Sequence, residues 1–206
     1  MATTTPNYGW PVPTSTDYVK DGATAIEALG DAIDATVFGL PKAGMTLVAN
    51  ATFSGATTYS VNNVFSSTYD NYMIQVSNMV PASFGNLALR MRVGGVDNSS
   101  SNYTAGRIYV GAFGSTALAS TNNSTSTEFI VVQVATGLDN NQATATITNP
   151  FNAVKTGFTG FGAGNLLDIN GGNMTVTTSY TGFTLLNSSG GNIAGTVRVY
   201  GLRNTV

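Results

Sequence analysis

The sequence contains no cysteine and no histidine, and only 9% of its 206 residues are charged. A typical soluble domain has about 25% charged residues. Because cysteine is absent, the chain can form no disulfide, no thiolate nucleophile and no cysteine-based metal site. Because histidine is absent, Ser-His-Asp catalysis and H-E-x-x-H zinc sites are excluded. An enzyme built from this chain would have to use acids, lysine, tyrosine or hydroxyl side chains.

Basic residues are also scarce, with eight against ten acidic residues and a formal net charge of −2. No basic stripe of the kind that binds phosphates occurs, so we expect no nucleic-acid partner. No apolar run approaches the ~18 residues of a membrane-spanning helix, so we expect no membrane insertion. The first residues lack the basic and apolar regions of a signal peptide. This predicts a protein that is made and kept in a cytoplasm, or assembled there into something larger.

Hydrophobic residues make up 42% of the chain, which is enough for a packed core. Threonine, asparagine and serine, with 30, 21 and 17 copies, account for about a third of it. Half of the acidic residues lie within residues 1–40, whose net charge is −4, whereas residues 41–206 have a net charge of +2. This shift in composition predicts an N-terminal appendage over residues 1–40 and a domain over residues 41–206.

The first sixteen residues combine three prolines with Tyr8, Gly9 and the single tryptophan, Trp10. Proline has a fixed φ and no N–H, so this stretch is interpreted as an extended arm. Trp10 is a candidate anchor in a partner's pocket, because one buried aromatic ring is a typical anchor of an interface. The alternative is that Trp10 folds back onto its own domain.

Residues 17–38 carry the only helical pattern in the sequence. Apolar residues recur at Ile26, Leu29, Ile33 and Val37, which places them in one stripe on a helix of about five turns. One amphipathic helix cannot bury such a stripe alone. Either the helix packs on the β domain that follows, or it docks on a partner or on copies of itself as a short coiled coil.

From residue 46 onward the apolar period changes to two, most clearly in Tyr72–Val76 and Leu87–Val93. Clusters of Gly, Asn, Asp and Ser, among them residues 120–126 and 170–173, are typical of turns. The glycine-rich stretch 157–164 is interpreted as a loop or a bulged strand. The expected strands are 46–53, 58–65, 70–78, 86–93, 103–112, 127–135, 142–149, 173–178, 181–187 and 193–200.

Eight to ten short strands with turns between them predict a mainly β protein. Its expected architecture is an N-terminal extended arm and one amphipathic helix, followed by an antiparallel β-sandwich of the jelly-roll kind. Threonine suits this fold because it is β-branched and yet compatible with solvent.

The sequence predicts no catalytic, cofactor-binding or metal-binding residues. Most acids of the β domain lie in turn-like segments, where Asp commonly caps its own backbone, and no calcium loop of the D-x-[DN]-x-[DN]-G type occurs. Carbohydrate binding is the more credible activity, because aromatic rings cover the apolar face of a sugar and amides pair with its hydroxyls. Asn102 and Tyr103 are the leading candidates for glycan contact, with Phe113 and Tyr180 as others.

Thr5–Asp17 reads TPNYGWPVPTSTD, and Val19–Leu29 and Ala32–Asp34 follow it. This segment resembles the N-terminal segment of many virion proteins of tailed bacteriophages, namely tail fibres, minor tail proteins and related appendages. Tyr180–Leu185 and Gly195–Gly201 resemble the closing strands of the β-sandwich in the same group.

In that group the N-terminal segment attaches a distal β domain to the particle, and the appendages are commonly homotrimers. The resemblance therefore implies a non-enzymatic virion protein, a tail fibre or tail appendage assembled in the cytoplasm of the bacterial host. Its β-sandwich would contact glycans of the host surface. Two other functions stay open, namely a capsid decoration, cement or neck protein and a small polysaccharide-degrading enzyme. The residues expected to anchor the chain to other virion proteins are Tyr8, Trp10, Ile26, Leu29, Ile33 and Val37.

Overall fold

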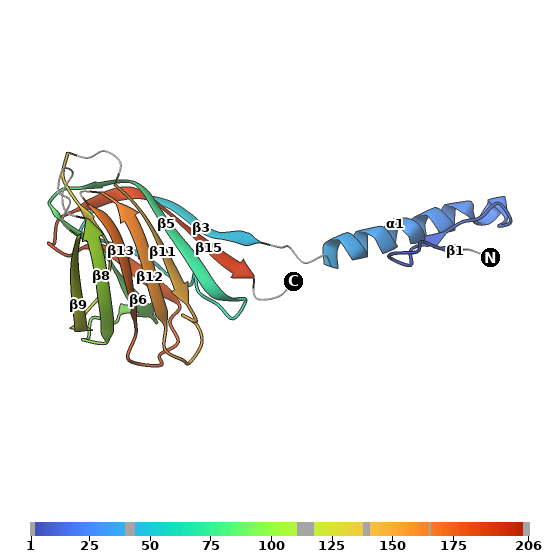
Figure 1. Ribbon diagram of the computed structural model, residues 1–206. Coiled ribbons are helices and arrows are strands. Elements are labelled where there is room, and N and C mark those ends of the chain that lie inside the picture. Colours follow the sequence, from blue (N-terminus) through green and yellow to red (C-terminus); the bar gives the residue numbers. More distant parts are fainter. Residues whose placement is uncertain (1–2, 40–43, 111–117, 138–140, 165, 204–206) are drawn as a thin grey trace. The chain divides into compact units, whose positions relative to one another are not determined.

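The chain divides into two compact units, Met1–Ala43 and Gly44–Asn204. This division lies close to the boundary between residues 40 and 41 that the charge distribution predicts. Figure 1 shows the elements of each unit. The computed structural model describes residues 3–39, 44–110, 118–137, 141–164 and 166–203.

The first unit consists of a short β-hairpin and one helix. Strands β1 (Thr3–Thr4) and β2 (Pro11–Val12) pair antiparallel. A single 3-10 turn, η1 (Val19–Asp21), leads into helix α1 (Gly22–Gly39). The expected helix over residues 17–38 is therefore confirmed, with its first turn in the tighter 3-10 form.

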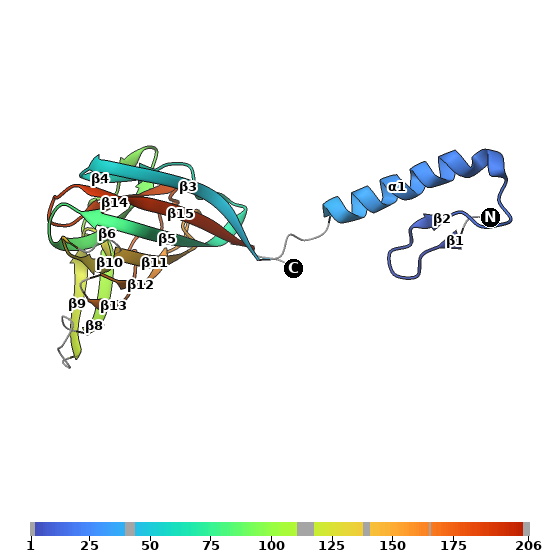
Figure 2. The same ribbon diagram turned by 90° about the horizontal axis from the view of Figure 1, so that it is seen from above.

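The second unit is a sandwich of two antiparallel sheets, seen edge-on in Figure 2. The larger sheet has the strand order β3-β15-β5-β11-β12-β13-β8-β9, and the smaller has the order β10-β6-β14-β4, with β7 paired to β6. The expected mainly β fold, with an N-terminal helix and an antiparallel sandwich, is confirmed. The strands are β3 (Met45–Ala56), β4 (Thr58–Val61), β5 (Tyr69–Pro81), β6 (Gly85–Val93), β7 (Val96–Asp97), β8 (Tyr103–Val110), β9 (Leu118–Ser126), β10 (Phe129–Val134), β11 (Asn141–Thr148), β12 (Gly157–Ala163), β13 (Leu167–Asn173), β14 (Gly182–Asn187) and β15 (Ile193–Arg203).

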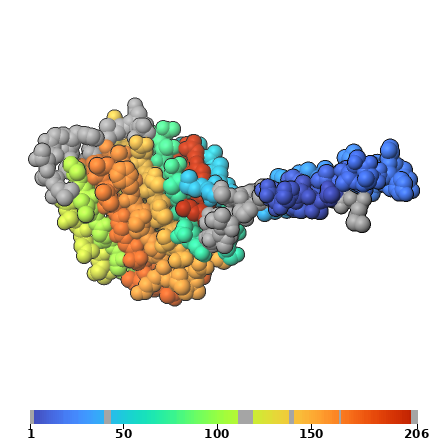
Figure 3. Space-filling view, turned by 45° about the vertical axis from the view of Figure 1, so that its right-hand side comes forward, coloured from blue at the N-terminus to red at the C-terminus, as the bar shows by residue number. Residues whose placement is uncertain are grey.

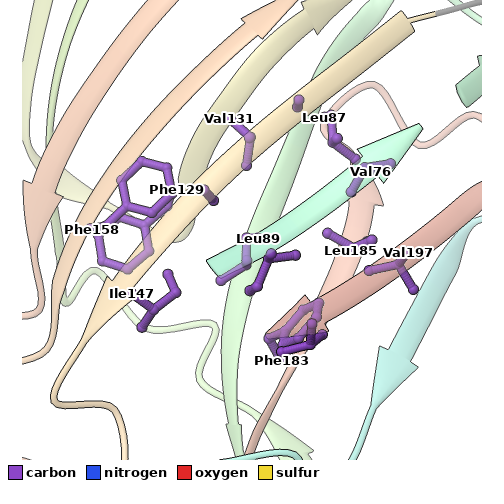
Figure 4. Packing of buried hydrophobic residues seen from close by; sticks show 14 of the residues in the cluster. Val76, Leu87, Leu89, Phe129, Val131, Ile147, Phe158, Phe183, Leu185 and Val197 are labelled. Carbon is purple, nitrogen blue, oxygen red and sulfur yellow. The ribbon is translucent and has the colours of Figure 1, made fainter. Parts of the chain in front are cut away.

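The hydrophobic core lies between the two sheets, and Figure 4 shows its packing. Phe129 on β10 stacks on Phe158 of β12, with ring centroids 4.5 Å apart. In the smaller sheet, Leu89 of β6 and Leu185 of β14 are direct partners in register, and both side chains are buried. The inward-facing residues of both sheets therefore form one core, as in other sandwiches.

β9 and the last part of β13 lie where the sequence predicts turns, and β12 lies where it predicts a loop or a bulged strand. β9 is built mostly from Ser, Thr and Asn, and most of its described side chains are exposed, so it shows no apolar alternation. β12 and β13 include the glycine-rich stretch and its neighbours. The expected strand over residues 173–178 is wrong, because beyond the end of β13 only Met174 pairs, in an isolated bridge to Tyr103.

Strand β12 is rich in glycine because β10 packs closely against its inner face. A Cβ atom at Gly162 would lie 2.7 Å from the Val132 side chain, and one at Gly160 would lie 2.8 Å from the Phe158 ring. Real Cβ atoms almost never approach so closely. A larger residue at Gly162 would press on β10 of the facing sheet, and one at Gly160 would press on the Phe158 ring of its own strand, so either would disturb the close packing of the core.

Candidate functional site

The hairpin of the first unit packs on its own helix through Trp10. The indole Nε1–H donates a hydrogen bond to Thr36 Oγ1 at 2.9 Å, and that hydroxyl donates in turn to the carbonyl oxygen of Ala32 at 2.8 Å. The Trp10 ring stacks on Tyr8, with centroids 5.0 Å apart and 15° between the ring planes. Trp10 is half-buried in this arrangement, so the alternative that it folds back onto its own chain describes the structure.

The expectation of an extended arm is wrong for residues 3–12, which form a hairpin. The amide of Thr5 donates to the carbonyl oxygen of Trp10 at 2.9 Å, and the amide of Gly9 donates to the carbonyl oxygen of Thr5 at 3.0 Å. Gly9 has a φ of 67°, which a residue without a Cβ adopts at little cost. The prolines of this segment predict extended backbone, so the sequence does not predict the turn at Gly9.

Trp10 is expected to hold the hairpin on the helix, so Trp10→Ala should release it. The loss of the ring contacts and of one hydrogen bond is worth about 2 kcal/mol, or roughly thirtyfold in local opening. Amide hydrogen exchange at Thr5 and Gly9 measures this opening. Tyr18→Ala is the control, because the Tyr18 side chain is 75% exposed. Equal exchange rates in the two variants would contradict the role of Trp10.

Helix α1 has no fully buried residue, and its apolar stripe is partly covered and partly exposed. Leu29 and Ile33 are half-buried, whereas Ile26 and Val37 remain 66% and 59% exposed. Residues 26, 33 and 37 lie on one side of the helix by their spacing. The hairpin therefore covers only part of the stripe, and an apolar strip stays exposed to solvent.

Other large apolar side chains of the first unit are also exposed, two just before α1 and one in its last turn. Tyr18, Val19 and Phe38 are 75%, 97% and 84% exposed. A groove of about 840 Å³ also lies between the segment that follows β2 and the first half of α1. The residues lining this groove are Pro11, Pro13, Thr14, Ser15, Thr16, Asp17, Tyr18, Val19, Asp21, Gly22, Thr24, Ala25 and Ala28.

Acidic side chains flank the apolar strip of α1. Glu27, Asp31 and Asp34 are exposed, and their spacing of four and three places them together on one face. Helix residues that are both apolar and exposed, beside a row of carboxylates, form a surface that a basic partner with apolar side chains would fit. Of the six expected anchoring residues, three are exposed (Tyr8, Ile26 and Val37) and three are half-buried (Trp10, Leu29 and Ile33).

The expected glycan contact at Tyr103 is wrong, because the Tyr103 side chain is fully buried. Its hydroxyl donates to the carbonyl oxygen of Asn98 at 2.7 Å and accepts the Met91 amide at 3.0 Å. Burial raises the pKa of the Tyr103 phenol, which keeps it neutral. A ring that packs edge-on against Phe129 in the core cannot lie under a sugar.

The other candidates for glycan contact have structural roles or lie outside the described residues. Asn102 is half-buried, and its carbonyl oxygen accepts the Thr175 amide at 2.8 Å. The Tyr180 side chain is buried, and its hydroxyl accepts a hydrogen bond from Asn98 Nδ2 at 2.7 Å. Phe113 lies outside the described residues.

The acids of the β-sandwich bind neighbouring side chains. Asp168 is fully buried and holds Arg107 through both carboxylate oxygens, at 2.6 and 2.9 Å. Glu128 pairs with Arg90 at 2.7 Å, and Asp97 pairs with Arg92. Asp70 accepts a hydrogen bond from Asn152, and Asp139 lies outside the described residues. In the part of the chain that is described, no three His, Cys, Asp or Glu residues are grouped to hold a metal ion.

No protein-family model, curated protein or solved structure matches this chain. Among the described helices, none has the length and apolar character needed to cross a membrane.

Proposed function

We propose that this chain is a non-enzymatic structural protein of a tailed-phage virion, a tail fibre or tail appendage. Its first unit would anchor it to other virion proteins, and its β-sandwich would contact glycans of the host surface. The observation that carries the proposal is the exposed apolar strip on α1, formed around Ile26 and Val37, in a unit separate from the sandwich. Large apolar side chains gathered at an exposed surface mark sites of protein interaction.

The anchoring partner is expected to present basic and apolar side chains. The net charge of residues 1–40 is −4, and the carboxylates of Glu27, Asp31 and Asp34 are exposed beside the apolar strip. Complementary charges favour encounter and select the partner, whereas the buried apolar contacts supply most of the affinity. Self-association into a homotrimer would place three such units at one attachment point and strengthen attachment by avidity.

We interpret the sandwich as a jelly roll with insertions. Four strands of the larger sheet, in the order β3-β15-β5-β11, face four strands of the smaller sheet, in the order β4-β14-β6-β10. Successive members of this set of eight, except β6 and β10, lie in opposite sheets. The pairs β8–β9 and β12–β13 then extend the larger sheet beyond the jelly roll. This interpretation supports a virion role, because capsid domains use the same architecture.

Replacing Ile26 with glutamate tests the anchor in the full-length chain. Burying a carboxylate in an apolar interface is unfavourable, so we expect incorporation into particles to fall at least about tenfold. Tagged chains would be supplied to infected host cells, and the tag would be quantified in purified particles. Ala35→Glu is the matched control, because Ala35 is exposed on α1 at a position turned away from the apolar strip by its spacing.

Equal incorporation of Ile26→Glu, Ala35→Glu and the unchanged chain would overturn the anchoring proposal. Circular dichroism of each purified variant shows whether the helix and the sandwich remain folded. The number of copies per particle separates a fibre, with tens or fewer, from a capsid decoration, with hundreds. Release of reducing ends from host polysaccharides by the purified chain would instead indicate the degrading enzyme.

A further inference from the structure

The outer face of the larger sheet carries a ridge of exposed apolar side chains across three strands. Phe161 of β12 is the direct register partner of Ile169 of β13, which in turn pairs with Ile108 of β8. These side chains are 53%, 55% and 48% exposed. Neighbouring strands lie about 4.8 Å apart, so the three side chains form a continuous row, named here the outer ridge. Leu167 and Val110, which also pair, extend it by one register level.

On one side of the outer ridge lies a hollow of about 690 Å³ whose floor is a pair of glycines. Gly106 of β8 and Gly171 of β13 face each other in register. Neither has a positive φ, and a Cβ atom on either would lie no closer than 3.7 Å to its neighbours. Backbone geometry and packing therefore do not require glycine here. A glycine inside a strand costs stability and often marks a bulge, a bend, or the close approach of a ligand or another backbone. The pairing of β8 with β13 has no bulge at this pair, which favours a ligand.

At the Phe161 end of the outer ridge, over β11 and β5, lies a second hollow of about 330 Å³. Its polar lining includes the side chains of Gln75, Gln142 and Thr144, and within the described residues none of these side chains is hydrogen-bonded to a protein partner. Gln142 is exposed, and the other two are half-exposed. Their amide and hydroxyl groups are therefore free to bind a ligand. Both hollows have volumes typical of small-molecule sites, about 300–1,000 Å³.

The two hollows and the outer ridge contain almost no charge. Among the described residues, Arg107 is the one ionised residue that lines them, and its guanidinium is held by the buried carboxylate of Asp168. The remaining lining consists of amides, hydroxyls, glycines, alanines and apolar side chains. An apolar ridge between uncharged donors and acceptors matches a ligand that has one apolar face, many hydroxyls and no charge. A neutral hexose oligosaccharide has this chemistry.

We infer that the outer face of β5, β11, β12, β13 and β8 binds a neutral glycan. Figure 3 shows this sheet from outside, with the strands lying side by side. A sugar ring lies against Phe161, its neighbours occupy the two hollows, and the Gln75 and Gln142 amides bind hydroxyls. The inference rests on the proposed role of the β-sandwich in host attachment, and it places the glycan on the sheet face instead of at the loop of Asn102 and Tyr103.

The test uses the purified full-length chain on an array of immobilised neutral hexose oligosaccharides and acidic, uronate-containing ones. We expect binding to neutral members, weakened at least about tenfold by Phe161→Ser, which removes the ring, and by Gly171→Leu, which fills the hollow. Phe84→Ser is the matched control, because Phe84 is 56% exposed outside the sheet. Asn50→Leu places the same leucine on the outer face at the far strand, β3.

Binding only to acidic glycans, binding to none, or equal binding by all four variants would overturn the inference. Sedimentation of the same proteins adds a second readout. If the unchanged chain is an oligomer that Phe161→Ser and Gly171→Leu both convert to monomers, the outer face is an interface between copies and the inference is wrong. The glycan-binding test needs no phage particle, so its outcome is independent of the anchoring test. A chain that binds neutral glycans but is absent from virions would overturn only the proposed function.

Discussion

Replacing Phe129 with alanine is expected to lower the free energy of unfolding of the β-sandwich by about 3–5 kcal/mol. The Phe129 ring is fully buried. It stacks on Phe158 at 4.5 Å and 5° between planes, and it meets Tyr103 edge-on at 4.8 Å. Phe129 belongs to β10 of the smaller sheet, whereas Phe158 and Tyr103 belong to strands of the larger one. Its removal therefore leaves a cavity at the contact between the sheets.

Urea unfolding followed by far-ultraviolet circular dichroism measures this loss. The intrinsic fluorescence of tryptophan does not report it, because Trp10 belongs to the first unit. That fluorescence serves instead as an internal check that the first unit is unchanged. Phe161→Ala is the control, because the Phe161 ring is 53% exposed and its loss should cost less than about 1 kcal/mol. Similar losses in the two variants would contradict the assignment of Phe129 to the core.

Replacing Asp168 with leucine is expected to cost about 3–5 kcal/mol, because it leaves the Arg107 guanidinium without its counter-ion. Asp168 is fully buried, and it also accepts the Gln133 amide of β10 at 2.6 Å. One carboxylate thus joins strands β13 and β8 of the larger sheet to the backbone of the smaller sheet. Breaking one partner of a buried pair is far more costly than removing both partners.

The double variant Asp168→Leu/Arg107→Met separates these two effects. We expect it to be more stable than Asp168→Leu alone, with a remaining loss of about 1–2 kcal/mol from the missing hydrogen bond to the Gln133 amide. The same urea titration measures both variants. If the double variant is as unstable as the single one, the charge of Arg107 is not what makes the loss of Asp168 costly.

The sequence predicts the strands of the sandwich well wherever one face of a strand is buried and the other is exposed to solvent. Leu87–Val93 and Val197–Tyr200 show this alternation and lie in β6 and β15. β9 escapes detection because most of its described side chains are exposed. β12 is predicted only as a loop or a bulged strand, because two of its three buried, inward-facing residues are Gly160 and Gly162, which close packing requires. Composition cannot distinguish such glycines from those of a turn.

The candidate surfaces are predicted less completely than the fold. The sequence shows the apolar stripe of α1, but it does not show which part of the stripe the hairpin covers. Only the folded structure shows that Ile26 and Val37 stay exposed. Tyr103 follows an Asn- and Ser-rich turn and was expected at the surface, yet the isolated bridge to Met174 and the contact with Phe129 draw it inward. The outer ridge had one visible signal, the alternation of Leu167 and Ile169 with polar residues.

Strand β3 depends on a partner that the ribosome makes much later. β3 lies at the edge of the larger sheet, and among the described strands β15 alone pairs with it. About 140 residues separate the end of β3 from the start of β15, so at 5–20 residues per second synthesis of the partner takes on the order of ten seconds. During translation the nascent sandwich therefore has an unfilled place between β3 and β5. A chain whose synthesis stops before β15 could not complete its larger sheet. It would expose the edges of β3 and β5, and unpaired strand edges are recognition features for chaperones and proteases.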